Sequence, residues 1–153
     1  MRLHLCVVGR LRGGPQAALV DEYLARFART GRGIGFAPVA LREIDDRGSC
    51  DEQAARLLRA LPSGPLCVLD ERGIQMASPR FAHMIAGWRD DGQQDAALVI
   101  GGADGLDPAL RSRADVVLSL GPMVWPHMLV RVMLAEQLYR AASILAGHPY
   151  HRA

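Results

Sequence analysis

The chain has 153 residues, a length that fits one folded domain covering residues 1–153. Half of the residues are hydrophobic and 22% are charged, a profile typical of a globular protein. No apolar run reaches the ~18 residues that a membrane-spanning helix needs, and the start of the chain does not resemble a signal peptide. We therefore expect a cytoplasmic protein that has no membrane partner.

The net charge of +2 says little about partners, but the 18 basic residues are all arginine. A guanidinium group pairs with phosphate bidentately and stacks on bases, which favours nucleic acid. A GC-rich genome, whose codons favour arginine, explains the same bias. The absence of lysine excludes an ordinary P-loop nucleotidase, since that loop needs Gly-Lys-[Ser/Thr].

The cysteines do not indicate a metal site or a disulfide framework. Cys6, Cys50 and Cys67 are widely spaced and form no Cys-x-x-Cys or Cys/His cluster. We therefore expect no metal and three inert thiols.

Strand and helix patterns alternate along the first half of the chain. Helix starts are marked by Gly13-Gly14-Pro15 and by a capping box of Ser49 and Glu52. The patterns predict strands at residues 3–8, 36–44 and 66–69. They also predict one helix that begins at Gly13-Gly14-Pro15 and another that begins at the capping box.

The alternation continues through the second half. Ser78 is an expected N-cap with Pro79 at the first helical position, and Asp107-Pro108 begins a short helix. The patterns predict a helix at 78–90, strands at 96–100 and 116–120, and a long helix at 129–146.

Such alternation favours an α/β fold, a mostly parallel sheet with helices on both faces. In open sheets of this kind the ligand lies outside the carboxyl ends of the strands. Three glycine-bearing loops fall at such ends, after Asp70, Ile100 and Leu120. We expect a cofactor there.

Two of these loops have distinctive compositions. The loop at 101–105 reads Gly-Gly-Ala-Asp-Gly, which allows a ligand to approach the backbone closely but is also compatible with a tight turn alone. The loop at 121–126 holds two prolines, so its backbone has little freedom. Its apolar residues could cover an adenine or could simply belong to the core.

The last helix and the tail contain further candidates. Arg131 falls on an apolar helix side, where an arginine needs a partner, either Glu136 or a residue of another subunit. A purely structural ion pair is the alternative. The tail at 148–152 is basic and aromatic, which suits phosphate contact and base stacking, although chain ends are commonly frayed.

Taken together, these features resemble the RlmH family of bacterial large-subunit rRNA pseudouridine N3-methyltransferases along essentially the whole chain. The motifs that carry the resemblance are Val8-Gly9, Tyr23-Leu24-Ala25-Arg26, Leu69-Asp70, residues 100–105, residues 127–141 and His148-Pro149-Tyr150-His151-Arg152. The last two are the most specific.

The resemblance implies a SPOUT fold with a deep C-terminal trefoil knot, a homodimer, and S-adenosylmethionine as cofactor. The substrate would be N3 of a pseudouridine in the helix 69 loop of 23S rRNA, on the assembled 70S ribosome and not on DNA. By position, the cofactor would be lined by Leu69, Asp70, Gly101, Gly102, Gly105, Gly121, Pro122, Met123, Val124, Trp125 and Pro126.

For such a reaction we hypothesise the following catalytic roles. His127 is the first candidate for the general base, ahead of Asp104 and His151. Arg131 would neutralise charge on the imide or anchor a phosphate, and Tyr150 and Arg152 would clamp the nucleotide. The cofactor loop departs from the family, which usually has serine and threonine where this chain has Met123, Val124 and Trp125.

Two other readings stay open at this point. The first is a knotted enzyme that acts on tRNA or on a ribose hydroxyl. The second is a nucleotide- or RNA-binding ribosome-assembly module without chemistry. A hydrolase is disfavoured because Ser119 and Ser143 sit in no Gly-x-Ser-x-Gly elbow.

Overall fold

The computed structural model describes residues 1–151 and contains a five-stranded sheet in the order β2-β1-β4-β3-β5. All neighbouring strands pair in parallel, so their carboxyl ends lie along one edge. The elements are β1 (Arg2–Val8), α1 (Gly14–Arg32), β2 (Ala40–Ile44), α2 (Cys50–Ala60), β3 (Leu66–Gln75), α3 (Ser78–Asp90), β4 (Asp95–Ile100), α4 (Pro108–Arg113), β5 (Val116–Ser119), α5 (His127–Leu145) and a 3-10 turn, η1 (Pro149–His151).

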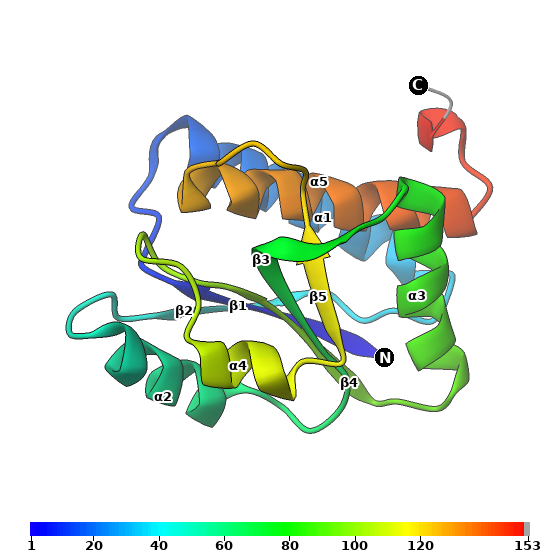
Figure 1. Cartoon of the computed structure of the whole chain (residues 1–153). Coiled ribbons are helices and arrows are strands. Elements are labelled where there is room, and N and C mark those ends of the chain that lie inside the picture. Colours follow the sequence, from blue (N-terminus) through cyan, green and yellow to red (C-terminus); the bar gives the residue numbers. More distant parts are fainter. Residues whose placement is uncertain (152–153) are drawn as a thin grey trace.

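Helices cover both faces of this sheet (Figure 1). α1, α3 and α5 pack on one face around Phe27, Phe81 and Leu134, and α2 and α4 pack on the other around Leu57 and Leu110. The expected α/β architecture with a parallel sheet is therefore confirmed. The trefoil knot stays a prediction.

The central strands are buried on both sides, which explains why they read as continuous apolar runs. Burial raises the pKa of the Cys6 thiol to about 11 and that of the Cys67 thiol to about 12. Both thiols therefore stay protonated and unreactive near neutral pH.

Two expected element starts are wrong. β2 begins at Ala40 and not at residue 36, because Phe36 turns into the core against Phe27, with ring centroids 5.8 Å apart. Ser78 is not an N-cap: Ala77 takes that position, and the Ser78 hydroxyl donates to Gln137 Oε1 at 2.7 Å. The sequence pattern does not contain either tertiary contact.

β3 is longer than expected. It continues to Gln75 after a register shift between Leu69 and Ile74, and this second part still pairs with β5. Gly73 permits the pairing, because a Cβ at this position would collide with the backbone of Val117. The extension places residues 70–73 beside the carboxyl edge of the sheet.

Among the described residues, no helix is both long enough and apolar enough to cross a membrane.

Candidate active site

A cavity of about 720 Å³ opens at the carboxyl ends of β3, β4 and β5. The three loops expected to meet there do meet. The expected cofactor residues that line it are Leu69, Asp70, Gly101, Gly102, Gly105, Gly121, Met123, Val124, Trp125 and Pro126, and His127 lines it with them. Pro122 does not.

Sequence reasoning missed several lining residues. Glu71, Arg72 and Ala103 lie within or beside the expected loops. The positions of these loops in the sequence were therefore enough to predict that the three residues line the cavity. Leu106 directly follows the 101–105 loop, and Val130 lies one helical turn after His127 on α5.

The 101–105 loop needs its glycines for space. A Cβ on Gly102 would lie 2.9 Å from Gln53 Oε1 and 3.1 Å from Val8 Cγ1. A Cβ on Gly101 would collide with the carbonyl group of Gly105, which itself has a φ of +84°. The loop is therefore a tight turn and, at the same time, a wall of the cavity to which a ligand can come close.

Asp70 is held by the protein itself. One carboxylate oxygen accepts a hydrogen bond from Arg111 Nη1 at 3.0 Å, and the other accepts one from the Arg72 backbone N–H at 2.9 Å. Its side chain is only 8% exposed. Asp70 thus fixes the rim of the cavity, which limits what it can offer a ligand.

The 121–126 loop does not place its apolar side chains in the core. Met123 and Val124 are 67% and 82% exposed, and Trp125 is 39% exposed, all at the cavity. The start of the loop is fixed because the Ser119 hydroxyl exchanges hydrogen bonds with the backbone N–H and carbonyl of Gly121. The loop presents an apolar surface that can cover a flat ring.

His127 is the first residue of α5 and is partly buried at the same cavity. Burial lowers its pKa, the nearby positive charge of Arg131 lowers it further, and Asp46 opposes them. The imidazole is therefore neutral near pH 7 and can accept a proton from a group in the cavity.

The structure corrects the expected partner of Arg131. Its partner is Glu43 on β2, with Nη1 2.9 Å from Oε1, and not Glu136. The guanidinium also donates to the carbonyl oxygens of Val8 and Gly9, both at 3.0 Å, and the side chain is fully buried. Arg131 therefore ties α5 to the ends of β1 and β2.

Glu136 instead organises the tail. It accepts hydrogen bonds from Arg140 and from the Tyr150 hydroxyl, the latter at 3.1 Å. Tyr150 also packs on Tyr139, with ring centroids 4.5 Å apart. Burial and the bond to Glu136 raise the pKa of Tyr150 to about 12, so the phenol stays protonated.

Tyr150 does not reach the cavity of its own chain. Tyr150 is docked beside Glu136 and Tyr139, which lie roughly 14–18 Å along α5 from His127 at the usual helical rise. Arg152 and the side chain of His151 lie outside the described residues. Nor does the described part of the chain gather three or more side chains of the kind that would hold a metal.

Comparison with known proteins identifies the family. The model of a family described as predicted SPOUT methyltransferase matches residues 1–151. The chain belongs to the SPOUT methyltransferase family. Two relatives called ribosomal RNA large subunit methyltransferase H, from Roseobacter denitrificans and Ruegeria pomeroyi, are 64% and 61% identical over 99% of both chains.

Solved structures support the same fold. A probable methyltransferase from Bordetella pertussis is 15% identical, with a TM-score of 0.50 and coverage of 92% of this chain and 95% of that one. A probable methylase family protein from Haemophilus influenzae gives a TM-score of 0.50 at 12% identity, over 97% of this chain and 69% of that one.

As a SPOUT methyltransferase, this protein is an enzyme with S-adenosylmethionine as cofactor. The cavity fits such a molecule. Its volume lies in the range of small-molecule sites, its glycine loop lets a ligand approach the backbone, and its apolar walls suit an adenine.

Proposed function

We propose that this enzyme methylates N3 of a pseudouridine in the helix 69 loop of 23S rRNA, on the assembled 70S ribosome. The observation that carries the proposal is identity of up to 64% over nearly the whole chain to proteins called ribosomal RNA large subunit methyltransferase H. The cavity, with a neutral histidine at its mouth, supports the same reaction.

The chemistry asks little of the protein beyond positioning and one proton transfer. S-adenosylmethionine supplies a methyl group that its sulfonium already activates. The 101–105 and 121–126 loops would hold this cofactor, and the apolar side chains of Met123, Val124 and Trp125 would exclude water and pack on the flat rings.

His127 is the proposed general base. The target N3 lies between two carbonyls and carries a proton that must leave before or during transfer. A neutral imidazole at the cavity can take that proton on a ring nitrogen, a contribution worth roughly 10²–10⁴-fold in rate.

Arg131 is the proposed positioning residue for His127. It lies one helical turn further along α5 and holds that helix against the ends of β1 and β2. Its buried positive charge also helps to keep the imidazole neutral. Both effects act through His127 and not on the substrate.

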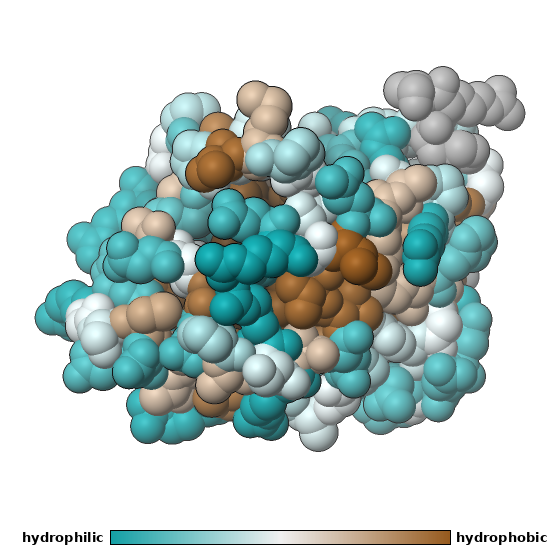
Figure 2. Space-filling view, in the orientation of Figure 1, coloured by the Kyte–Doolittle hydropathy of each residue, from teal (hydrophilic) through white to brown (hydrophobic). Residues whose placement is uncertain are grey.

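The enzyme would work as a homodimer, with Tyr150 and Arg152 of one protomer clamping the nucleotide at the cavity of the other. The support is the distance of docked Tyr150 from its own cavity. A separate, largely apolar cavity of about 550 Å³ between α1, α3, α5 and β5 offers a surface for a second copy. Figure 2 shows apolar side chains gathered over β5 and toward α3.

A ribosomal substrate would place the enzyme in the cytoplasm.

The test is transfer of labelled methyl from S-adenosylmethionine to 70S ribosomes and to free 23S rRNA, both lacking the native modification. The proposal predicts label in helix 69 of the ribosomes and little in free rRNA. Label in tRNA or on a ribose hydroxyl would favour a related knotted enzyme with another target. Cofactor and RNA binding without any transfer would favour a ribosome-assembly module.

A further inference from the structure

A third cavity, of about 570 Å³ and lined mostly by charged residues, lies where the loops that follow β1 and β2 meet. It is lined by Arg10, Arg12, Ile44, Asp45, Asp46 and Arg47. We propose that Arg10, Arg12 and Arg47 form a docking surface for backbone phosphates of the RNA substrate. The choice of RNA as the ligand rests on the proposed function.

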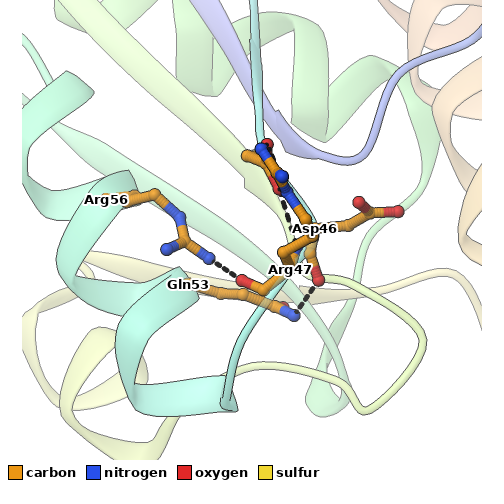
Figure 3. Close-up of polar contacts among 5 residues, drawn as sticks. Asp46, Arg47, Gln53 and Arg56 are labelled. Carbon is orange, nitrogen blue, oxygen red and sulfur yellow. Dashed lines mark hydrogen bonds and ion pairs between the residues drawn. The ribbon is translucent and has the colours of Figure 1, made fainter.

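The β2–α2 loop is held rigidly by α2 (Figure 3). The buried side chain of Gln53 donates to the carbonyl oxygen of Asp46 at 2.8 Å, and Arg56 donates to that of Arg47. A capping box of Ser49 and Glu52 fixes the start of the helix. The backbone is thus fixed, while the side chain of Arg47 is 88% exposed. A cation presented by an ordered loop loses less entropy on binding than one on a mobile loop.

The arginines of this cavity are available to a ligand. Within the described part of the chain, the guanidinium groups of Arg10 and Arg12 make no hydrogen bond or ion pair with the protein, and both residues are exposed. Arg47 donates to Asp45 through both Nε, at 2.9 Å, and Nη2, at 2.7 Å, but the two side chains are 88% and 40% exposed, and exposed ion pairs are worth only ~0–1 kcal/mol. A phosphate can accept the same two guanidinium donors in place of the Asp45 carboxylate at a small net cost.

The arginine cavity adjoins the cofactor cavity. Gln53, which supports the β2–α2 loop, packs against Gly102 in the wall of the cofactor cavity. Asp46 faces His127 closely enough to influence its protonation. An RNA strand whose target base enters beside His127 therefore brings neighbouring phosphates past Arg10, Arg12 and Arg47.

The test measures binding of the full-length enzyme to unmodified 70S ribosomes and to free 23S rRNA across a salt series. Each lost phosphate contact should reduce the slope of log affinity against log salt by ~0.7. The double variant Arg10→Gln/Arg12→Gln should therefore reduce this slope by ~1.4, and Arg47→Gln should reduce it by up to ~0.7. The affinity for the cofactor should not change in either variant.

The matched control is Arg29→Gln with Arg32→Gln. These two exposed arginines lie in the last turn of α1, away from the carboxyl edge of the sheet, so removing them changes the net charge equally. The control should leave the salt slope at the wild-type value. Equal slopes for the control and for the Arg10/Arg12 variant would overturn the proposal.

Asp45→Asn tests the same surface through a gain in RNA affinity. A misfolded variant would not show such a gain. The substitution frees Arg47 and should tighten RNA binding by up to about fivefold at low salt. Affinity that is equal to or below wild type would contradict the role of Arg47.

Two further outcomes separate the possible failures. If the Arg10/Arg12 variant loses affinity for ribosomes but keeps the wild-type salt slope, the surface does not contact phosphates and the proposal fails. If the wild type methylates no rRNA and the variant still loses salt-dependent RNA binding, the proposed function fails while the docking surface stands.

Discussion

The two halves of α5 hold their charged residues in opposite ways. In the first half, Arg131 is completely buried and is bonded to Glu43 and to two backbone carbonyls. In the second half, Glu136 and Arg140 pair while both side chains remain about one-fifth exposed. The first arrangement fixes the wall of the active site, whereas the second holds the tail through contacts that water or a substrate can replace.

The largest effect expected from this contrast is on stability. Arg131→Met removes the only cation paired with Glu43 in the described structure and the hydrogen bonds to two backbone carbonyls, and should lower the free energy of unfolding by about 3–5 kcal/mol. Arg140→Met, the matched change in the second half, should cost about 1 kcal/mol or less. Urea unfolding measures both, and equal losses would contradict the distinction.

The next effect is on the rate of methyl transfer. His127→Gln removes the proposed base and should reduce kcat by about 100-fold or more at pH 7, with little change in cofactor affinity. Single-turnover transfer to unmodified ribosomes, together with cofactor binding by calorimetry, separates the two quantities. An unchanged kcat at every pH would remove His127 from the mechanism.

The protonation of His127 predicts a pH profile. Because burial and Arg131 lower its pKa below the ordinary 6.5, the imidazole stays neutral at pH 7 and is protonated only as the pH falls further. The rate should therefore fall on the acid side with a midpoint below 6.5 and should be flat around neutrality. His127→Gln should abolish that acid limb, and a midpoint above 6.5 would contradict the assignment.

The smallest effect is expected at the tail. Tyr150→Phe removes the hydrogen bond to Glu136 but keeps the packing on Tyr139, and should cost ~0.5–1.5 kcal/mol of stability. If the tail clamps the nucleotide, KM for ribosomes should rise while cofactor affinity stays constant. A stability loss with an unchanged KM would leave the tail with a structural role only.

The sequence predicted the strands that lie in the hydrophobic core. It did not predict strand boundaries that depend on tertiary contacts. β1 and β4 are continuous apolar runs apart from Arg2, His4 and Asp95, so local sequence was sufficient to predict them. The start of β2 depended on the packing of Phe36 against Phe27, and the extension of β3 depended on space that Gly73 leaves for β5. Neither contact is visible in local sequence.

The candidate site, too, could be predicted where it depends on local sequence and not where it depends on tertiary contacts. Glycine-bearing loops at strand ends predicted the cavity, because parallel strands bring those ends together. The partner of Arg131 could not be predicted, since Glu43 is 88 residues away in the sequence. The tail residue Tyr150 was a candidate from its composition, but only the fold shows how far it lies from its own cavity.

The measurement that tests the central claim most directly is mapping of the added methyl group by mass spectrometry of nuclease-digested 23S rRNA. The substrate is unmodified 70S ribosomes treated with wild-type enzyme or with His127→Gln. The account predicts one methyl group on N3 of a helix 69 pseudouridine, formed by the wild type and strongly reduced in the variant. A methyl group on a ribose or on another RNA, or equal yield from the variant, would contradict it.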